Sequence, residues 1–504
     1  MELRIKTIRL SFRNNIFPVA IGLIGMCCIF ICTRKYGIGL SDDSVTYISV
    51  AQNVISGNGY VNFLGDQMSM FPPLYPAILA VLSIGLFDII KIACYLNIIL
   101  FGLLIITSAY WFLAHIKSAF LVFWGAGIIF FPMPLIEITL NAWSEILFIL
   151  FIILAFSEMQ QFNNNENTRT IFIAGLFTAL ACLVRYLGLS LVLTGILLIL
   201  FNIQIPVYQK IKRVLIFSLI SMLTISFWIL NNYLHSNTLF GYRNLSRTSF
   251  INNIYSTGNI IAGWFLPANL SLYLKIIISA LLLCIIIIGI IFIFKRGREA
   301  FTSTDKMKIA PLIIFIISFV IVLILSSSII ELDPADNRLL SPIYLPLLFL
   351  VIFSFDRIRI LFKNKFIHFS ILLIFCLWSI YSISNAASTV RRAYLEGAGG
   401  HHTVKWMESE LIASLKKQNL KGTIFTNEPN AVYILTDNHS ISNVSQLMKT
   451  NELIKERNPK FLVLFNQINP SFIDFLSSEK FNSRYKLDEL FSNNEGKIYL
   501  IIRY

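Results

Sequence analysis

The sequence predicts an integral membrane protein, mainly α-helical and multi-span, with a C-terminal α/β domain outside the membrane. Three observations support this fold class. The mean hydropathy of the 504 residues is +0.72. Only 13% of the residues are charged, about half of the ~25% that is typical of soluble domains. After residue 386 the composition becomes polar and Asn-rich. A cytosolic globular enzyme and a disordered protein are thereby excluded.

Apolar segments of sufficient length recur along the first three quarters of the chain. A helix needs roughly 17 to 25 predominantly apolar residues to cross the hydrocarbon core. We expect eleven spans, at about 16–33, 91–113, 118–136, 144–158, 169–184, 187–203, 214–232, 272–294, 309–330, 343–355 and 366–385. The apolar stretch 74–88 is shorter and lies between a Pro-Pro pair and an aspartate. Its length favours an interfacial or re-entrant helix.

The net charge of +14 is divided into short basic runs between the apolar segments. A nucleic-acid partner would require a basic patch on one folded face, so none is predicted. Because Lys and Arg are enriched in cytoplasmic loops, the N-terminus with Arg4 and Lys6 is expected to be cytoplasmic. The basic runs near 117, 295–308 and 357–365 then also lie inside. The prediction is a multi-pass protein of the cytoplasmic membrane, in contact with its lipids, with an extracytoplasmic C-terminal domain.

Two domains follow from these observations. Residues 1–385 are expected to form the transmembrane domain, with amphipathic outer-loop helices at about 42–57 and 74–88, and residues 386–504 the extracytoplasmic α/β domain. Apolar runs such as 461–465 have the composition of strands. Adjacent His401 and His402 diverge in direction and lack a third metal ligand in the sequence, so a solvent-facing loop is predicted there.

The most informative polar segment is 41–53, on the predicted outer side. Ser41 or Asp42 can cap a helix, and Asp43 lies one helical turn from Tyr47, on the same face. Ionisable groups near the membrane are costly and are therefore candidates for function. The alternative is that both aspartates only stabilise the helix N-terminus through its dipole. Spacing alone does not separate these two interpretations.

The next element is Phe-Pro-Pro-Leu-Tyr-Pro at 71–76. Together with Asp-Ser-x-x-Tyr at 43–47 and Ala-x-Asn-x-x-x-Gly-x-Gly at 51–59, it resembles the GT-C glycosyltransferases, the lipid-phosphosugar-dependent enzymes related to protein O-mannosyltransferases and aminoarabinose transferases. Similar family elements follow at Ser144-Glu145, Gly175 to Tyr186, Trp228 to Arg243, Arg338 to Pro346, and Gly397 to Tyr433. The similarity covers most of the chain, although each motif is short.

The resemblance implies transfer of a hexosyl or pentosyl group from a polyprenyl-phosphate carrier to a lipid, glycan or protein acceptor on the outer face, usually with inversion. Asp43 is then the expected general base, because it has the Ser and Tyr at the family spacing, and Asp42 is the alternative. Glu145 is a further catalytic candidate, for acceptor positioning or for holding a divalent cation; otherwise it is a helix N-terminal charge. No cofactor is assigned beyond that possible cation, and no metal ligands are assigned.

A leaving lipid phosphate needs cations to stabilise its charge. The implied substrate-binding residues are Tyr47, Tyr75, Arg185, Arg243 and Arg338. Each arginine could instead be a snorkelling residue or the partner of a nearby carboxylate. Asn231 stands where the family pattern has an arginine, so a phosphate-binding role is not carried to that position.

Two other functions remain open. A transporter or flippase of a lipid-linked or polar substrate would have internal repeats and broken helices near mid-membrane, and no repeat is evident in the sequence. A ligase or polymerase of surface polysaccharide would share the topology, but it would not account for Asp-Ser-x-x-Tyr combined with Pro-Pro-Leu-Tyr-Pro. The sequence names neither the sugar nor the acceptor.

Overall fold

The computed structural model describes residues 2–504 except 86–87, 163–167, 203–204, 268–269, 272, 275–302, 333–335, 362–363, 437, 439, 449–458 and 467–469. It consists of two compact units, each built from several chain segments. The first unit comprises Met1–Cys32, Ser69–Ile78 and Cys94–Arg391. The second comprises Thr33–Met68, Leu79–Ala93 and Arg392–Tyr504. The second unit therefore joins the first predicted outer loop to the C-terminal tail.

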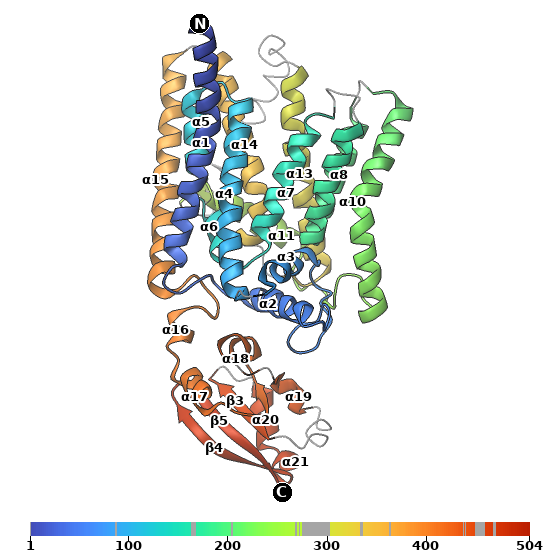
Figure 1. Ribbon diagram of the computed structural model, residues 1–504, viewed down its shortest axis with the longest axis vertical. Helices are drawn as coiled ribbons and strands as arrows, with labels where there is room; N and C mark the ends of the chain where they lie inside the picture. Colours follow the sequence, from blue (N-terminus) through green and yellow to red (C-terminus); the bar gives the residue numbers. More distant parts are fainter. Residues whose placement is uncertain are drawn as a thin grey trace. The chain divides into compact units, whose positions relative to one another are not determined.

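The first unit is a helical bundle, in which the long helices run side by side (Figure 1). Its helices are α1 (Glu2–Thr33), α4 (Ile89–His115), α5 (Ala119–Ile128), α6 (Met133–Leu140), α7 (Glu145–Met159), α8 (Thr168–Val184), the short 3-10 helix η1 (Tyr186–Gly188), α9 (Leu189–Leu200), α10 (Val207–Ser236), α11 (Phe250–Gly263), α13 (Ser303–Ile329), α14 (Asn337–Leu361) and α15 (Lys365–Glu396). Helices α4 and α15 extend into the second unit, and α3 (Leu74–Ser83) contributes to both units.

Six helices in the described part of the chain are long and apolar enough to cross a membrane: Ile16–Thr33, Ile89–His115, Val207–Ser236, Met307–Ile329, Asn337–Ile360 and His368–Glu396. Helices α5 and α6 meet at a bend of 44° and give a seventh candidate if they form one broken span. Helix α7 has 15 residues, and 168–184 and 186–200 form shorter apolar helices. The predicted span 272–294 lies outside the described residues apart from 273–274. The total of eleven spans stays a prediction.

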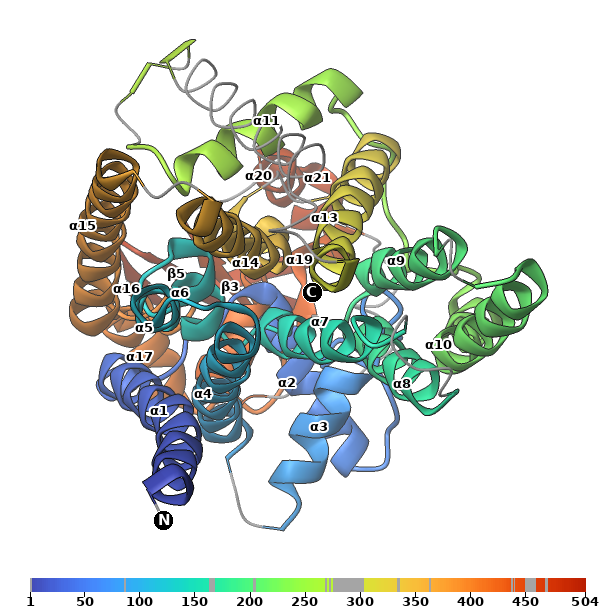
Figure 2. The same cartoon turned by 90° about the horizontal axis from the view of Figure 1, so that it is seen from above.

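Helix α7 lies in the interior of the bundle. It packs against α8, and α8 in turn packs against α10; α14 contacts α6, α7 and α13 (Figure 2). Every residue of the first half of α7, from 145 to 150, is buried, and Ile146, Phe148, Ile149 and Ile152 are completely buried. A helix that is apolar on all sides is stable only inside a bundle of other helices. The first residue of α7, Glu145, is thereby held in the interior of the first unit.

The second unit contains α2 (Asp42–Ile55) and the tail elements. These are α16 (Val404–Met407), α17 (Glu410–Gln418), β1 (Thr423–Thr426), α18 (Pro429–Leu435), β2 (Ile441–Asn443), α19 (Val444–Met448), β3 (Lys460–Phe465), α20 (Pro470–Ser477), α21 (Glu479–Asn482), β4 (Tyr485–Asn493) and β5 (Gly496–Arg503). The sheet has the strand order β2-β1-β3-β5-β4. Strand β1 is parallel to β2 and β3, whereas β5 is antiparallel to β3 and β4.

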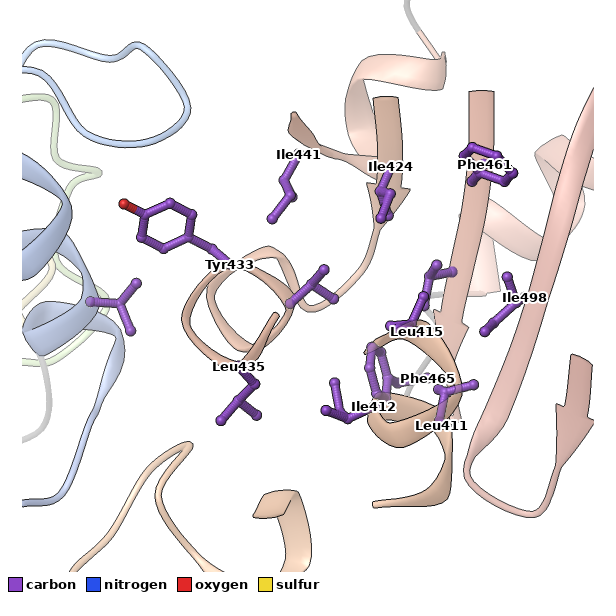
Figure 3. Close-up of a cluster of buried hydrophobic side chains, with 13 residues drawn as sticks. Leu411, Ile412, Leu415, Ile424, Tyr433, Leu435, Ile441, Phe461, Phe465 and Ile498 are labelled. Carbon is purple, nitrogen blue, oxygen red and sulfur yellow. The ribbon is translucent and has the colours of Figure 1, made fainter. Parts of the chain in front are cut away.

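One core cluster of this unit lies between the sheet and helices α17 and α18 (Figure 3). It includes Leu411, Ile424, Val432 and Ile498, all at most 2% exposed. Val45 of α2 belongs to the same cluster and is completely buried. Each Å² of apolar area that is removed from water contributes roughly 25 cal/mol to stability. The burial of Val45 therefore helps to hold α2 against this core.

The predicted fold class is confirmed: the protein is a mainly helical, multi-span membrane protein with a small C-terminal α/β domain. The helix predicted at 42–57 and the one predicted at 74–88 correspond in position to α2 and α3.

Candidate functional site

Three charged residues of the first unit meet at the N-terminus of α7. The Oε1 atom of Glu145 accepts hydrogen bonds from Nη1 of Arg185 and from Nε of Arg338, each at 2.5 Å. The three side chains are 1%, 14% and 9% exposed, respectively. These residues, here called the Glu145 cluster, are all predicted site residues, and the fold brings them together from three parts of the chain.

Local structure explains how each arginine reaches the carboxylate. Helix α8 ends at Val184, and the extended backbone of Arg185 (φ −148°, ψ 138°) directs its side chain out of the helical path. Arg185 also donates to the Oγ atom of Ser144, at 3.3 Å. Arg338 lies in the first turn of α14, and its guanidinium group lies 4.2 Å from the ring centroid of Trp143. This distance is within the range of a cation–π interaction.

The Glu145 cluster places two positive charges on one carboxylate. Both guanidinium groups donate to the same oxygen of Glu145, in a setting that is almost wholly shielded from water. Buried charge is costly unless a counter-charge is present. Guanidinium groups present planar, bidentate donors that match phosphate and carboxylate groups. The cluster is therefore suited to bind an anionic group and to stabilise negative charge that grows on it.

A second hydrogen-bond network centres on Tyr186, the residue that follows Arg185. The hydroxyl group of Tyr186 donates to the carbonyl oxygen of Ser69 at 2.9 Å. It accepts from Nε1 of Trp228 at 3.1 Å and from Nδ2 of Asn232 at 2.9 Å. These bonds fix the backbone just before the Pro-Pro element at 71–76. No role was predicted for these residues, although Tyr186 and Trp228 lie within the family-like segments 175–186 and 228–243. Nothing in a single sequence shows that their polar atoms converge.

The predicted binding residue Arg243 lies on the loop after α10. Its Nη2 atom donates to the carbonyl oxygen of Met70 at 3.4 Å. The neighbouring Gly241 has φ +80°, and a Cβ atom there would lie 2.9 Å from Cα of Met70. Only glycine fits both the left-handed backbone and this close approach. The loop thus contacts the segment that leads to the Pro-Pro element, in which Tyr75 is completely buried.

Helix α2 of the second unit carries the two aspartates and Tyr47. The N-cap is Ser41, which forms a capping box with Ser44. Asp42 and Asp43 follow in the first turn, where a negative charge interacts favourably with the helix dipole. Asp43 is half-buried, and Tyr47 is 1% exposed.

Asp42 has two partners from the tail. Its Oδ1 atom accepts hydrogen bonds from Nδ2 of Asn430 at 2.8 Å and from Nε2 of His401 at 3.2 Å. The hydrogen bond from His401 is the main reason that the pKa of Asp42 lies below its ordinary value, and the bond from Asn430 acts in the same direction. Since the Asp42 side chain is 75% exposed, solvent screens much of this interaction.

The prediction of a solvent-facing loop at His401 and His402 is wrong. The side chain of His401 is only 9% exposed and faces Asp42, and Nδ1 of His402 is 2.9 Å from the carbonyl oxygen of Ile38. These contacts join positions about 360 residues apart, which local sequence patterns do not reveal. Within the described ranges no group of three or more His, Cys, Asp or Glu residues has the geometry to hold a metal ion.

No family model matches the sequence, and no curated protein matches it significantly. The structure does match solved structures. ArnT from Cupriavidus metallidurans bound to undecaprenyl phosphate has a TM-score of 0.57 at 13% identity, over 96% of this chain and 97% of that chain. The apo state of the same protein gives a TM-score of 0.57 at 12% identity over the same shares. ArnT is an aminoarabinose transferase of the GT-C family. The resemblance seen in the sequence motifs is therefore confirmed at the level of the fold: the protein has the GT-C-like architecture of ArnT, over nearly its whole length.

Proposed function

We propose that the protein is a membrane glycosyltransferase that moves a sugar from a polyprenyl-phosphate carrier to an acceptor on the outer face of the cytoplasmic membrane. The observation that carries the proposal is the Glu145 cluster, a buried site in which two guanidinium groups meet at one carboxylate. It belongs to a fold shared with ArnT, whose solved structure contains undecaprenyl phosphate. A lipid phosphate is the kind of anion that such a site would neutralise.

The residues divide into two roles in the proposed reaction. Arg185 and Arg338 bind the phosphate of the donor and stabilise the charge that grows on it as the glycosidic bond breaks. Asp43 takes the proton of the attacking acceptor hydroxyl or amine, because such a group is a weak nucleophile until a base removes its proton. Attack on the face opposite the leaving phosphate inverts the anomeric centre. Glu145 orients both guanidinium groups.

The positions of the charged residues favour a transferase over a transporter or flippase. Glu145 is the first residue of α7, Arg185 follows the end of α8, and Arg338 is the second residue of α14. They thus lie at helix ends, and the sequence shows no internal repeat of the kind that is typical of transporters. A polysaccharide ligase or polymerase remains the alternative within membrane enzymes.

The test is transfer of radiolabel from polyprenyl-phosphate sugars in membranes that contain the full-length protein. Loss of a general base typically costs 10²- to 10⁴-fold in rate, so Asp43→Asn should reduce transfer by about that factor. Arg247→Ala, at an exposed arginine, is the control and should transfer normally. Full transfer by a folded Asp43→Asn variant would show that the base is assigned wrongly. Absence of transfer by the wild-type protein from every polyprenyl-phosphate donor would contradict the function.

A further inference from the structure

The backbone of the tail is joined directly to the segment before α2. Leu40 and Gly400 form a parallel β-bridge, in which the N–H of Leu40 donates to Gly399 O at 3.2 Å and the N–H of His401 donates to Leu40 O at 2.8 Å. Gly400 has φ +58°, and a Cβ atom there would collide with the carbonyl group of Leu40. The two segments can approach this closely only because position 400 is a glycine.

This bridge brings His401 to the first turn of α2. There, His401 and Asn430 both donate to the same oxygen of Asp42. The ring of His401 is also packed edge-on against Trp406, with centroids 5.4 Å apart. A side chain held on one face by a ring and at its tip by a carboxylate has little rotational freedom, so the contact with Asp42 is well defined.

The other end of α2 is held by α18. The hydroxyl group of Tyr433 donates to Oε1 of Gln52, and its ring stacks on Phe63 at a centroid distance of 4.3 Å. Tyr433 extends from α18 away from the sheet and towards the Thr33–Met68 segment of the same unit (Figure 3). Between these two ends, Val45 is buried in the core cluster of the unit. The tail therefore contacts α2 in its first turn and again in its last turn.

The contacts come from the part of an α/β sheet that usually binds ligands. In open sheets, ligands lie at the carboxyl ends of the parallel strands. Strands β1 and β3 are parallel, and Asn427, just after β1, pairs through its amide with the backbone of Phe465 at the end of β3. Asn430 and Tyr433 follow directly. In this protein, residues at that edge bind a helix of the same chain.

We propose that His401 and Asn430 are positioning residues, which hold Asp42 so that the adjacent Asp43 is correctly oriented as the general base. Successive residues on a helix differ in direction by about 100°. With Asp42 fixed against the tail, Asp43 is directed to a different side. The doubled aspartate then has divided roles, since Asp42 anchors the helix and Asp43 reacts. This assignment rests on the proposed function, and it gives the C-terminal domain the role of holding the helix that carries the base.

The first test compares variants of the full-length protein in the transfer assay. The double variant His401→Ala, Asn430→Ala should lower kcat by about tenfold or more, because small misplacements of a catalytic group are costly. The KM for the lipid donor should change by less than about twofold, since the Glu145 cluster is untouched. His401→Gln keeps a donor for Asp42 and should restore most of the kcat. Lys497→Ala, on the exposed face of β5, is the control in the same domain and should behave as wild type.

Wild-type kcat in the double variant would overturn the proposal, and so would a loss in kcat that His401→Gln does not restore. A second readout is independent of the donor: hydrogen–deuterium exchange of the peptides covering 42–55. The double variant should exchange faster there than wild type and Lys497→Ala, whereas unchanged exchange contradicts the anchoring. If the wild-type protein transfers no sugar, the proposed function fails, and the exchange data alone then decide whether the tail holds α2.

Discussion

The two ends of α14 carry two different clusters of buried charge. At its start, Arg338 belongs to the Glu145 cluster, in which two arginines share one carboxylate oxygen. Nineteen residues later, or about 28 Å further at ~1.5 Å per residue, Arg357 bonds Asp356 at 3.2 Å and Asp305 at 3.0 Å. Lys308 also bonds Asp305, at 3.4 Å. This second group, here called the Arg357 cluster, joins two cations to two carboxylates.

The partners of the carboxylates differ as well. Both oxygens of Asp356 accept hydrogen bonds from backbone N–H groups, of Lys117 and Ser118, each at 3.0 Å, at the start of α5. Among the described residues, by contrast, Oε2 of Glu145 accepts no hydrogen bond. Carboxylate oxygens that are bonded by arginine and by backbone N–H groups hold helices together, whereas two guanidinium groups that share one carboxylate oxygen can also bind a further anion. We therefore propose a structural role for the Arg357 cluster and a binding role for the Glu145 cluster.

The largest expected effect is a loss of stability at the structural end. Asp356→Ala removes a buried carboxylate from its arginine and from two backbone donors, and breaking such a pair typically costs about 3–5 kcal/mol. Thermal unfolding of the purified protein should show a clear decrease in Tm, while transfer per folded molecule is retained. Asp488→Ala, at an exposed position of β4, is the control. A variant with normal Tm but no transfer would reverse the two assignments.

The second largest effect is a loss of transfer at the binding end. Arg338→Ala removes one of two charged donors, and loss of one such group typically lowers kcat by about 10²-fold or more. Arg357→Ala should leave transfer per folded molecule close to wild type. The pair of variants is compared in one transfer assay, normalised to the amount of folded protein. Equal losses in both would mean that the clusters do not differ in function.

A smaller effect is expected when the charge of the Glu145 cluster is increased. Glu145→Gln removes the negative charge of this side chain while keeping an oxygen acceptor for the arginines. Equilibrium binding should show polyprenyl phosphate bound about 3- to 10-fold more tightly, because one opposing charge is removed at short range. Weaker binding would indicate that Glu145 contributes mainly by orienting the arginines.

The smallest effect concerns pH and the anchoring of α2. The hydrogen bond from His401 lowers the pKa of Asp42 below its ordinary value of 3.8. The contacts of the ionised Asp42 therefore stabilise the second unit fully when the pH is above 3.8. The contribution is lost as the pH falls through the lowered pKa of the folded state. The Tm difference between wild type and Asp42→Ala should therefore be small, since Asp42 is largely exposed, and should vanish in strong acid. A difference that grows on acidification would contradict this.

Much of the fold could be predicted because it depends on local composition. Apolar runs and their lengths identified α1, α4, α10, α13, α14 and α15, and the change in composition near residue 386 identified the tail. Glu145, Arg185 and Arg338 were predicted as site residues because they lie in short motifs that resemble those of the GT-C family. Their contacts with one another were not part of that prediction.

What could not be predicted depends on contacts between distant residues. In the sequence, Arg357 served only to mark a cytoplasmic loop, because counting the charges of loops treats each arginine as exposed to water. In the structure, the Arg357 side chain is 3% exposed and is bonded to Asp305, 52 residues away. The role of Gly400 depends on the approach of Leu40, which no local pattern encodes. His401 was misjudged for the same reason.

The central claim is that the Glu145 cluster binds the phosphate of a lipid carrier, and direct binding tests it best. Radiolabelled undecaprenyl phosphate is equilibrated with the purified full-length protein and with Arg338→Ala and Arg357→Ala. We expect Arg338→Ala to bind at least about tenfold more weakly than wild type, which corresponds to ~1.4 kcal/mol, and Arg357→Ala to bind as wild type does. Equal binding by wild type and a folded Arg338→Ala variant would contradict the claim.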